Sequence, residues 1–133
     1  MQFPDRTEAI IIHARLAREA ETKGDFALAR LSYFKWVESL RQQNVNTGGA
    51  LEKDLAAAQR AYSAFAGRDP LYLKICGDVL SYIASHPGVL QTDLYKEFPA
   101  FSQEDLRYAL YFAGDHGKIK REKKGQTYTL TAA

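Results

Sequence analysis

The segment with the densest charge in the sequence lies near its C-terminus. Five basic residues stand against the single Glu122 within seven positions: Lys118, Lys120, Arg121, Lys123 and Lys124. Without this segment, acidic residues would outnumber basic ones, so the net charge of +2 depends on it. Clustered cations suit contacts with phosphate groups, whose counterions are released on binding. The alternative is a solvated hairpin whose lysines protect a sheet edge from pairing with other strands.

The histidines and the cysteine form no pattern that indicates catalysis or metal binding. His13, His86 and His116 belong to three different predicted elements, and no pair has the spacing of a metal site. Cys76, the only cysteine, falls on the apolar face of a predicted helix, where a thiol is usually an inert core group. No glycine-rich loop follows a predicted strand, and the aspartates are spread over separate helices. We therefore expect no enzymatic activity, no catalytic residue, no metal and no cofactor.

The length and composition limit the class of protein. A chain of 133 residues can form one domain of ordinary size or two small ones. With one cysteine no internal disulfide can form, so an apolar core must hold the fold. The sequence has no apolar run long enough for a transmembrane helix or a secretory signal. These features favour a cytoplasmic protein without a membrane partner.

Three helices are predicted in the first half, because apolar residues recur there at helical spacing. The first covers roughly residues 5–23, and the second begins after Asp25, which is a suitable N-cap. Leu31 and Phe34 widen the apolar stripe of the second helix, so we expect neighbours to contact it on two sides. Residues 44–49 are rich in turn formers and are predicted to be a mobile loop before the third helix. The three stripes together predict a closed bundle.

A new unit is predicted to begin near residues 67–70. Asp69 is a suitable N-cap for a helix whose first residue is Pro70, a position that proline favours. We therefore assign residues 1–68 to the three-helix bundle and residues 69–133 to a second domain.

The second domain is predicted to contain three helices, a short strand and a hairpin. Its first helix carries an apolar face made of Leu71, Ile75, Val79, Tyr82 and Ile83. The short apolar pair Val89-Leu90 leads into a helix over about residues 91–98. Ser102 forms a capping box with Asp105 and begins a helix whose core face is Leu106, Ala109, Leu110 and Ala113. Residues 119–121 and 127–131 are strand-like and flank a polar turn that contains a glycine.

Three consecutive features of this domain point to a known fold. They are the run V-L-Q-T-D-L-Y-K-E-F at residues 89–98, the capped helix within residues 102–117, and the basic run at residues 118–121. Together they resemble the helix-turn-helix and first wing strand of winged-helix regulators. The resemblance implies a recognition helix for the major groove, followed by a hairpin wing. The expected fold is mainly α, with an N-terminal three-helix bundle and a C-terminal winged-helix domain.

The predicted recognition helix turns one set of side chains away from its apolar face. This set consists of Glu104, Arg107, Tyr108, Tyr111 and Asp115, with Gln103 at its edge. Gln103 and Arg107 could bond to base edges, and the two tyrosines could contact sugars, phosphates or thymine methyl groups. The candidate DNA-binding residues are therefore these four and the five cations of the basic segment. The two carboxylates make this face slightly acidic, which suits a protein partner about as well.

The first half has a weaker resemblance of its own. It is carried by Ala17, Ala20, the turn Gly24-Asp25-Phe26, Ala29, Tyr33 and Trp36. Their arrangement resembles one tetratricopeptide-type helical hairpin, and the three helices also resemble the small bundles of microtubule-interacting and trafficking domains. A single repeat unit cannot form a solenoid, so we expect a closed bundle that serves as a scaffold or for dimerisation.

The sequence as a whole predicts a DNA-binding protein, a small transcriptional regulator that uses a winged helix with a basic wing. Its expected partners are double-stranded DNA and, through the N-terminal bundle, a second copy or another protein. A dimer is expected because two half-sites multiply the specificity of one recognition helix. The alternative is a protein-interaction adaptor whose winged helix serves assembly, as in the helical-repeat plus winged-helix subunits of proteasome-lid-type complexes.

Overall fold

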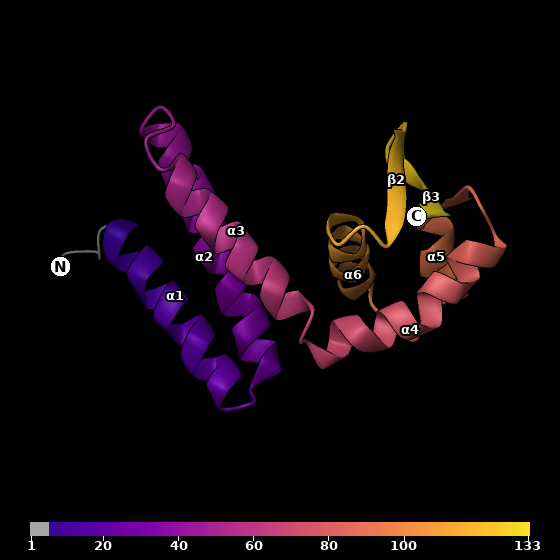
Figure 1. Cartoon of the computed structure of the whole chain (residues 1–133), viewed down its shortest axis with the longest axis horizontal. Coiled ribbons are helices and arrows are strands. Elements are labelled where there is room, and N and C mark those ends of the chain that lie inside the picture. The colour runs from indigo at the N-terminus through magenta and orange to yellow at the C-terminus, as the bar shows by residue number, and fades with distance from the viewer. Residues whose placement is uncertain (1–5) are drawn as a thin grey trace. The chain divides into compact units, whose positions relative to one another are not determined.

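The computed structural model describes residues 6–133, and the chain divides into two compact units, Met1–Phe65 and Ala66–Ala133 (Figure 1). The described residues form six helices and three strands, so the predicted mainly α fold with β structure at the C-terminus is confirmed. The sequence places the boundary between residues 68 and 69, whereas the compact units divide between Phe65 and Ala66, at the end of a helix. Asp5, at the start of the first predicted helix, lies outside the described residues.

The N-terminal unit is built from α1 (Arg6–Thr22), α2 (Phe26–Asn46) and α3 (Glu52–Ala66). Gly24, with φ +77°, turns the chain between α1 and α2. Asp25 then caps α2, because its Oδ1 accepts a hydrogen bond from the backbone nitrogen of Leu28 at 3.2 Å. The predicted N-cap is therefore confirmed.

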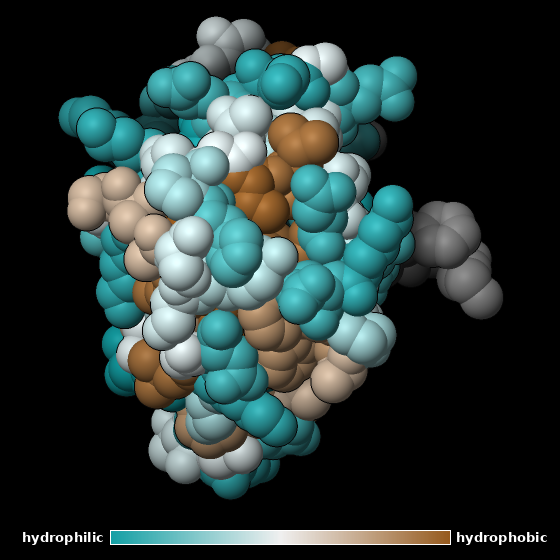
Figure 2. All heavy atoms as spheres, turned by 90° about the vertical axis from the view of Figure 1, so that its right-hand side faces the viewer, coloured by the Kyte–Doolittle hydropathy of each residue, from teal (hydrophilic) through white to brown (hydrophobic). Residues whose placement is uncertain are grey.

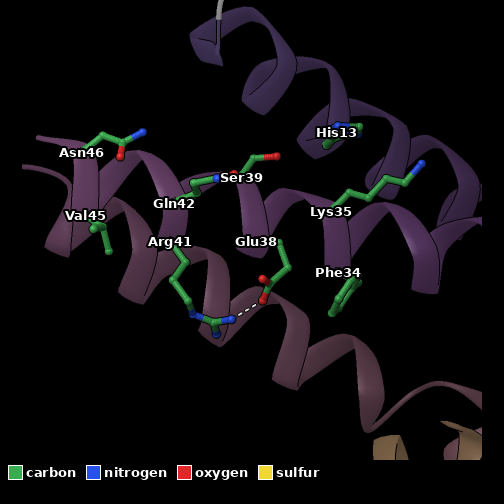
Figure 3. A pocket seen from close by; sticks show the side chains of 9 residues that line it. All are labelled: His13, Phe34, Lys35, Glu38, Ser39, Arg41, Gln42, Val45 and Asn46. Carbon is green, nitrogen blue, oxygen red and sulfur yellow. Dashed lines mark hydrogen bonds and ion pairs between the residues drawn. The ribbon is translucent and has the colours of Figure 1, made fainter.

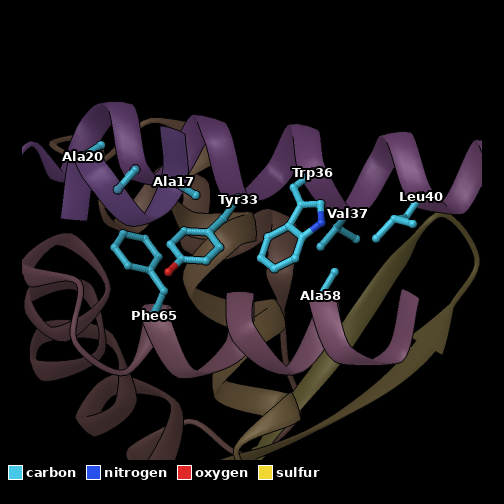
Figure 4. Packing of buried hydrophobic residues seen from close by; sticks show 9 residues of the cluster. Ala17, Ala20, Tyr33, Trp36, Val37, Leu40, Ala58 and Phe65 are labelled. Atoms are coloured by element: carbon cyan, nitrogen blue, oxygen red, sulfur yellow. The ribbon is translucent and has the colours of Figure 1, made fainter. Parts of the chain in front are cut away.

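The core of this unit combines small residues with aromatic rings (Figure 4). Ala17 and Ala20 of α1 and Ala29 of α2 are buried, and such small side chains let two helices approach closely. Tyr33 of α2 stacks on Phe65 of α3, with ring centroids 4.8 Å apart. The aromatic rings therefore pack between α2 and α3, while the alanines let α1 pack closely against α2.

The turn between α2 and α3 differs from the prediction. Residues 44–46 are helical, and the turn itself holds Gly48 and Gly49, both at positive φ. The buried Asn44 side chain accepts a hydrogen bond from the backbone nitrogen of Leu51 at 2.8 Å. Its amide nitrogen also donates to Glu52 at 3.0 Å. The side chain of Asn44 therefore connects the end of α2 to the start of α3. These hydrogen bonds hold Asn44 in the last turn of α2 rather than in the predicted loop.

The expectation that neighbours contact α2 on two sides is wrong for the described residues. Leu31 is 48% exposed and Phe34 is 50% exposed. Both α1 and α3 pack on the face of α2 that carries Tyr33 and Trp36, which leaves the opposite face uncovered.

The C-terminal unit contains three helices and a small antiparallel sheet. The elements are α4 (Pro70–Ser85), β1 (Val89–Leu90), α5 (Gln91–Glu97), α6 (Gln103–Asp115), β2 (Ile119–Lys124) and β3 (Thr127–Ala132). The strand order is β1-β3-β2, with Val89 opposite Leu130 and Lys124 opposite Thr127. Gly125, at φ +62°, begins the tight turn between β2 and β3. The predicted hairpin is present, and β1 adds a third strand beside it.

Local caps define both longer helices of this unit. The side chain of Asp69 accepts a hydrogen bond from the backbone nitrogen of Leu71 at 3.1 Å, with Pro70 as the first residue of α4. Ser102 caps α6 by accepting from the backbone nitrogen of Asp105 at 3.1 Å. Both predicted caps are confirmed. They could be predicted because capping depends on residues only two or three positions apart.

The core of this unit lies between α4, α6 and the inner face of the sheet. The buried residues include Ile75, Val79, Ile83, Leu94, Leu106, Leu110, Phe112 and Leu130. One predicted core position on α4 is shifted, because Tyr72 is fully buried while Leu71 is only partly buried. The ring of Tyr72 packs against that of Tyr108, with centroids 6.5 Å apart, so contacts with α6 determine which residue turns inward.

Candidate nucleic-acid interface

The outer face of α6 presents three of the predicted contact residues. Gln103 and Arg107 are exposed one helical turn apart, and the Arg107 Nε donates to the Gln103 carbonyl oxygen at 3.4 Å. Tyr111 is 51% exposed, with its ring edge-on to Phe112 at 5.0 Å. The side-chain amide of Gln103 and the terminal nitrogens of the Arg107 guanidinium are therefore donors on exposed side chains.

The same face also carries negative charge. Glu104 and Asp115 are both exposed, at opposite ends of α6. Glu104 lies in the first turn, where a carboxylate interacts favourably with the helix dipole. The acidic residues flank the exposed Arg107, as the sequence indicated.

Tyr108 was predicted to project outward from α6, and this prediction is wrong. Its side chain is partly buried, and its hydroxyl donates a hydrogen bond to Oδ2 of Asp69 at 2.8 Å. Asp69 is fully buried at the N-terminus of α4, so one carboxylate caps α4 and also holds α6. Tyr108 thus acts as a positioning residue for α6, because its hydrogen bond joins α6 to the start of α4. A hydrogen bond to a carboxylate typically stabilises a fold by about 1.5–3 kcal/mol.

A second polar contact holds the C-terminal end of α6. The hydroxyl of Tyr72 and Nδ1 of His116 lie 3.1 Å apart and form a hydrogen bond. Burial raises the pKa of the Tyr72 hydroxyl, which therefore stays protonated and can donate this bond. The Nζ of Lys118 lies 5.6 Å from the centre of the Tyr72 ring, so the first cation of the basic segment also packs against α4.

The basic hairpin, which we define as Lys118 with strands β2 and β3, divides its cations into two groups. Lys120, Lys123 and Lys124 are exposed along β2. Lys118 is exposed as well but interacts with Tyr72, as described above. The outer part of the hairpin therefore presents three ammonium groups within five residues.

Arg121 is not an exposed cation of this hairpin, in contrast to the prediction. It is partly buried on the face of β2 that also carries the buried Ile119, and its guanidinium lies 4.2 Å from the centre of the Tyr128 ring. Its Nη2 donates to Oε1 of the buried Gln91 at 3.3 Å. It also passes close to Gly114, where an added Cβ would lie 3.2 Å from the Arg121 Cδ. Arg121 thus connects the sheet to the start of α5 and to α6.

Sequence reasoning missed the residues that position this surface. Asp69 was assigned only as a cap, and Tyr72, Gln91 and Tyr128 were assigned no functional role. The partners of Asp69, Tyr72 and Gln91 are 30 to 44 positions away along the chain, so no local pattern could identify them. Tyr128 contacts Arg121 on the other strand of the hairpin.

The described residues also bear on metal binding and on membrane insertion. Residues 6–133 contain no group of three potential metal ligands, and none of their helices is long and apolar enough to cross a bilayer. Cys76 is buried, and burial raises the pKa of its thiol. Figure 2 shows the side on which α5 and the sheet lie in Figure 1, with hydrophilic residues over most of the surface and small hydrophobic patches between them.

Comparisons of the chain with protein families, with curated proteins and with solved structures find no match in any of the three.

Proposed function

We propose that the C-terminal unit is a winged-helix domain that binds double-stranded DNA and that the protein is a small transcriptional regulator. The element order of this unit, from α4 to β3, and the pairing of β1 with β3 support the fold assignment. In this proposal α6 enters the major groove and the basic hairpin serves as the wing that contacts the DNA backbone.

The observation that carries the proposal is the exposed triplet Lys120, Lys123 and Lys124 on the basic hairpin. Each lysine can contact a phosphate and release counterions. Gln103 and Arg107 supply exposed donors on α6, and Arg107 can bind the guanine O6 and N7 in a bidentate manner. Two hydrogen bonds, from Tyr108 to Asp69 and between Tyr72 and His116, support a fixed orientation of α6.

The test is a titration of the full chain with random duplex DNA at several salt concentrations. The triple variant Lys120→Ala, Lys123→Ala and Lys124→Ala should bind more weakly and should lower the salt slope by about 3, since each phosphate contact contributes about 0.9. A matched control removes three exposed cations of the N-terminal unit: Lys23→Ala, Lys53→Ala and Arg60→Ala. If both triple variants change binding equally, only net charge matters and the hairpin is not the contact surface.

Arg107 tests whether α6 reads the sequence of the DNA. On a duplex selected from a random library, Arg107→Ala should cost about 1–3 kcal/mol, with little loss on random DNA. An equal loss on both duplexes would mean that Arg107 contacts only phosphate. No loss on either duplex would mean that Arg107 of α6 does not take part in DNA recognition.

The second candidate function is that of a protein-interaction adaptor. The observation that favours it is the combination of exposed carboxylates, Glu104 and Asp115, with the half-exposed ring of Tyr111 on one face of α6. Aromatic residues are enriched at protein interfaces, and carboxylates repel phosphate. The absence of DNA binding at low salt would favour this function.

A further inference from the structure

The outer face of α2 carries large apolar side chains in contact with solvent. Leu31 is 48% exposed, Phe34 is 50% exposed and Val45 is 75% exposed. At 100° per residue they lie on one side of α2, opposite the buried Tyr33 and Trp36. This arrangement gives α2 a second apolar stripe, which the core of the unit does not use.

Two charged residues occupy the same stripe between the apolar ones. Glu38 and Arg41 form an ion pair, and both side chains are partly exposed. Figure 3 shows that Phe34, Glu38, Arg41 and Val45 leave α2 on the same side. We define the α2 stripe by its members, which follow one another at spacings of 3, 4, 3 and 4 residues: Leu31, Phe34, Glu38, Arg41 and Val45. This is the a/d spacing of a coiled-coil seam.

The α2 stripe is complementary to itself when two copies run antiparallel. A two-fold axis near residues 39 and 40 places Phe34 against Val45 of the second copy. The same register places Glu38 against Arg41 of the second copy, and two-fold symmetry repeats both contacts. A parallel pair would instead place Glu38 against Glu38 and Arg41 against Arg41. The charges therefore favour one orientation and one register.

We propose that the α2 stripe binds a second copy of this chain, as an antiparallel α2–α2 pair with two Glu38–Arg41 bridges between two Phe34–Val45 contacts. The proposal does not depend on DNA binding. In this register Leu31 lies opposite Gly48 of the second copy, where the missing side chain leaves room at the turn.

The central charged layer determines the register, while the flanking apolar layers bury surface. Because Glu38 and Arg41 already pair within one helix, exchanging partners between copies leaves neither charge unpaired. A polar pair at one core layer of a coiled coil typically selects register and orientation. A register shifted by seven residues, with the two-fold axis at residue 36, would place Glu38 against Phe34 and Arg41 against Leu31 of the second copy.

The test is sedimentation of the full chain without DNA over a range of concentrations. We expect a concentration-dependent dimer. Glu38→Arg and Arg41→Glu should each weaken the dimer by about 100-fold, because each places like charges opposite each other twice. The double variant, Glu38→Arg with Arg41→Glu, should dimerise as the wild type does.

A mixture of the two single variants gives the sharpest result. One chain then has two arginines in the stripe and the other has two glutamates, so an equimolar mixture should form a heterodimer although neither variant dimerises alone. Arg60→Glu, at an exposed position of α3, is the matched control and should leave the dimer unchanged. Far-UV circular dichroism of every variant confirms that it is folded.

Several outcomes would overturn the proposal. They are a wild-type chain that stays monomeric at every concentration, single variants that dimerise normally, or a mixture that forms no heterodimer. Loss of DNA binding would not affect these measurements, so the failure of one proposal can be distinguished from the failure of the other.

Discussion

The two units of the chain hold their helices together in different ways. In the N-terminal unit, buried alanines bring α1 onto α2, and α3 packs through the stacked rings of Tyr33 and Phe65. Hydrogen bonds between side chains nearer in the sequence, from Tyr33 to Glu21 and from Asn44 to Glu52, also join these helices. In the C-terminal unit, hydrogen bonds between side chains far apart in the sequence join α4 to α6 and α5 to β2.

This difference has a consequence for what each unit can do. Apolar packing is not directional, so it stabilises a bundle without specifying the angle of each side chain. Hydrogen bonds weaken steeply away from their preferred geometry, so the contacts of Tyr108 and His116 orient α6. The unit proposed to read DNA thus has hydrogen bonds between elements at residues 30 to 44 positions apart. Those of the bundle span 8 and 12 positions, and the bundle also presents an open apolar stripe.

The largest expected effect comes from breaking the aromatic packing of the N-terminal unit. Phe65 is fully buried, so Phe65→Ala should lower the free energy of unfolding of this unit by about 3–5 kcal/mol. Trp36, the only tryptophan, lies in the same unit, and its fluorescence reports this transition during denaturation. Phe34→Ala is the matched control at an exposed ring, and at low protein concentration it should change little. An equal loss for both variants would contradict the difference in burial between Phe65 and Phe34.

A smaller effect is expected from the polar contacts of the C-terminal unit. Asp69→Ala removes both the cap of α4 and the acceptor for Tyr108, and should cost about 2–4 kcal/mol. The matched control Asp25→Ala removes only an exposed cap and should cost about 1 kcal/mol. Asp69→Ala should shift the transition seen by circular dichroism but leave that of Trp36 fluorescence in place. A shift of the Trp36 transition by Asp69→Ala would mean that the units do not unfold separately.

The smallest expected effect is on the pH dependence of the stability of the N-terminal unit, which should differ from that of the C-terminal unit through His13. Burial, and repulsion from Lys35, lower the pKa of His13 below its usual 6.5. As the pH falls below 6.5, the unfolded chain binds a proton that folded His13 resists, so this unit loses a little stability. His13→Gln should remove part of this loss between about pH 7.5 and about pH 5.5, measured by Trp36 fluorescence. His86→Gln, in the other unit, should keep the wild-type dependence of the Trp36 transition, and the same dependence in all three proteins would contradict a role for His13.

Most element boundaries follow from short-range chemistry and could be predicted. Asp25, Asp69 and Ser102 cap helices through bonds to backbone nitrogens two or three residues away. Gly125 and the polar residues around it predict the hairpin for the same reason. The end of α2 was predicted less well, because Asn44, usually a turn former, uses its side chain to hold the start of α3.

The exposed residues of the candidate site could be predicted in part, because helical periodicity placed Gln103, Arg107 and Tyr111 on the outer face of α6. The cations of the site were found because they are adjacent in the sequence, but the separate role of Arg121 depends on Gln91, 30 positions away. Tyr108 was assigned to the outer face because helical periodicity gives the angle of a residue and not its partner. The exposed stripe on α2 was missed because periodicity identifies apolar faces without showing which of them a neighbour covers.

The sequence by itself determined the helices, their caps, the hairpin and the location of the basic segment, because each depends on residues within a few positions of one another. The tertiary structure alone decided which charged and apolar side chains remain exposed. Whether Arg121 covers Tyr128, whether Tyr108 bonds to Asp69 and whether Phe34 stays in solvent depend on contacts between distant segments. Such contacts form only when folding brings those segments together, so local sequence patterns cannot predict them.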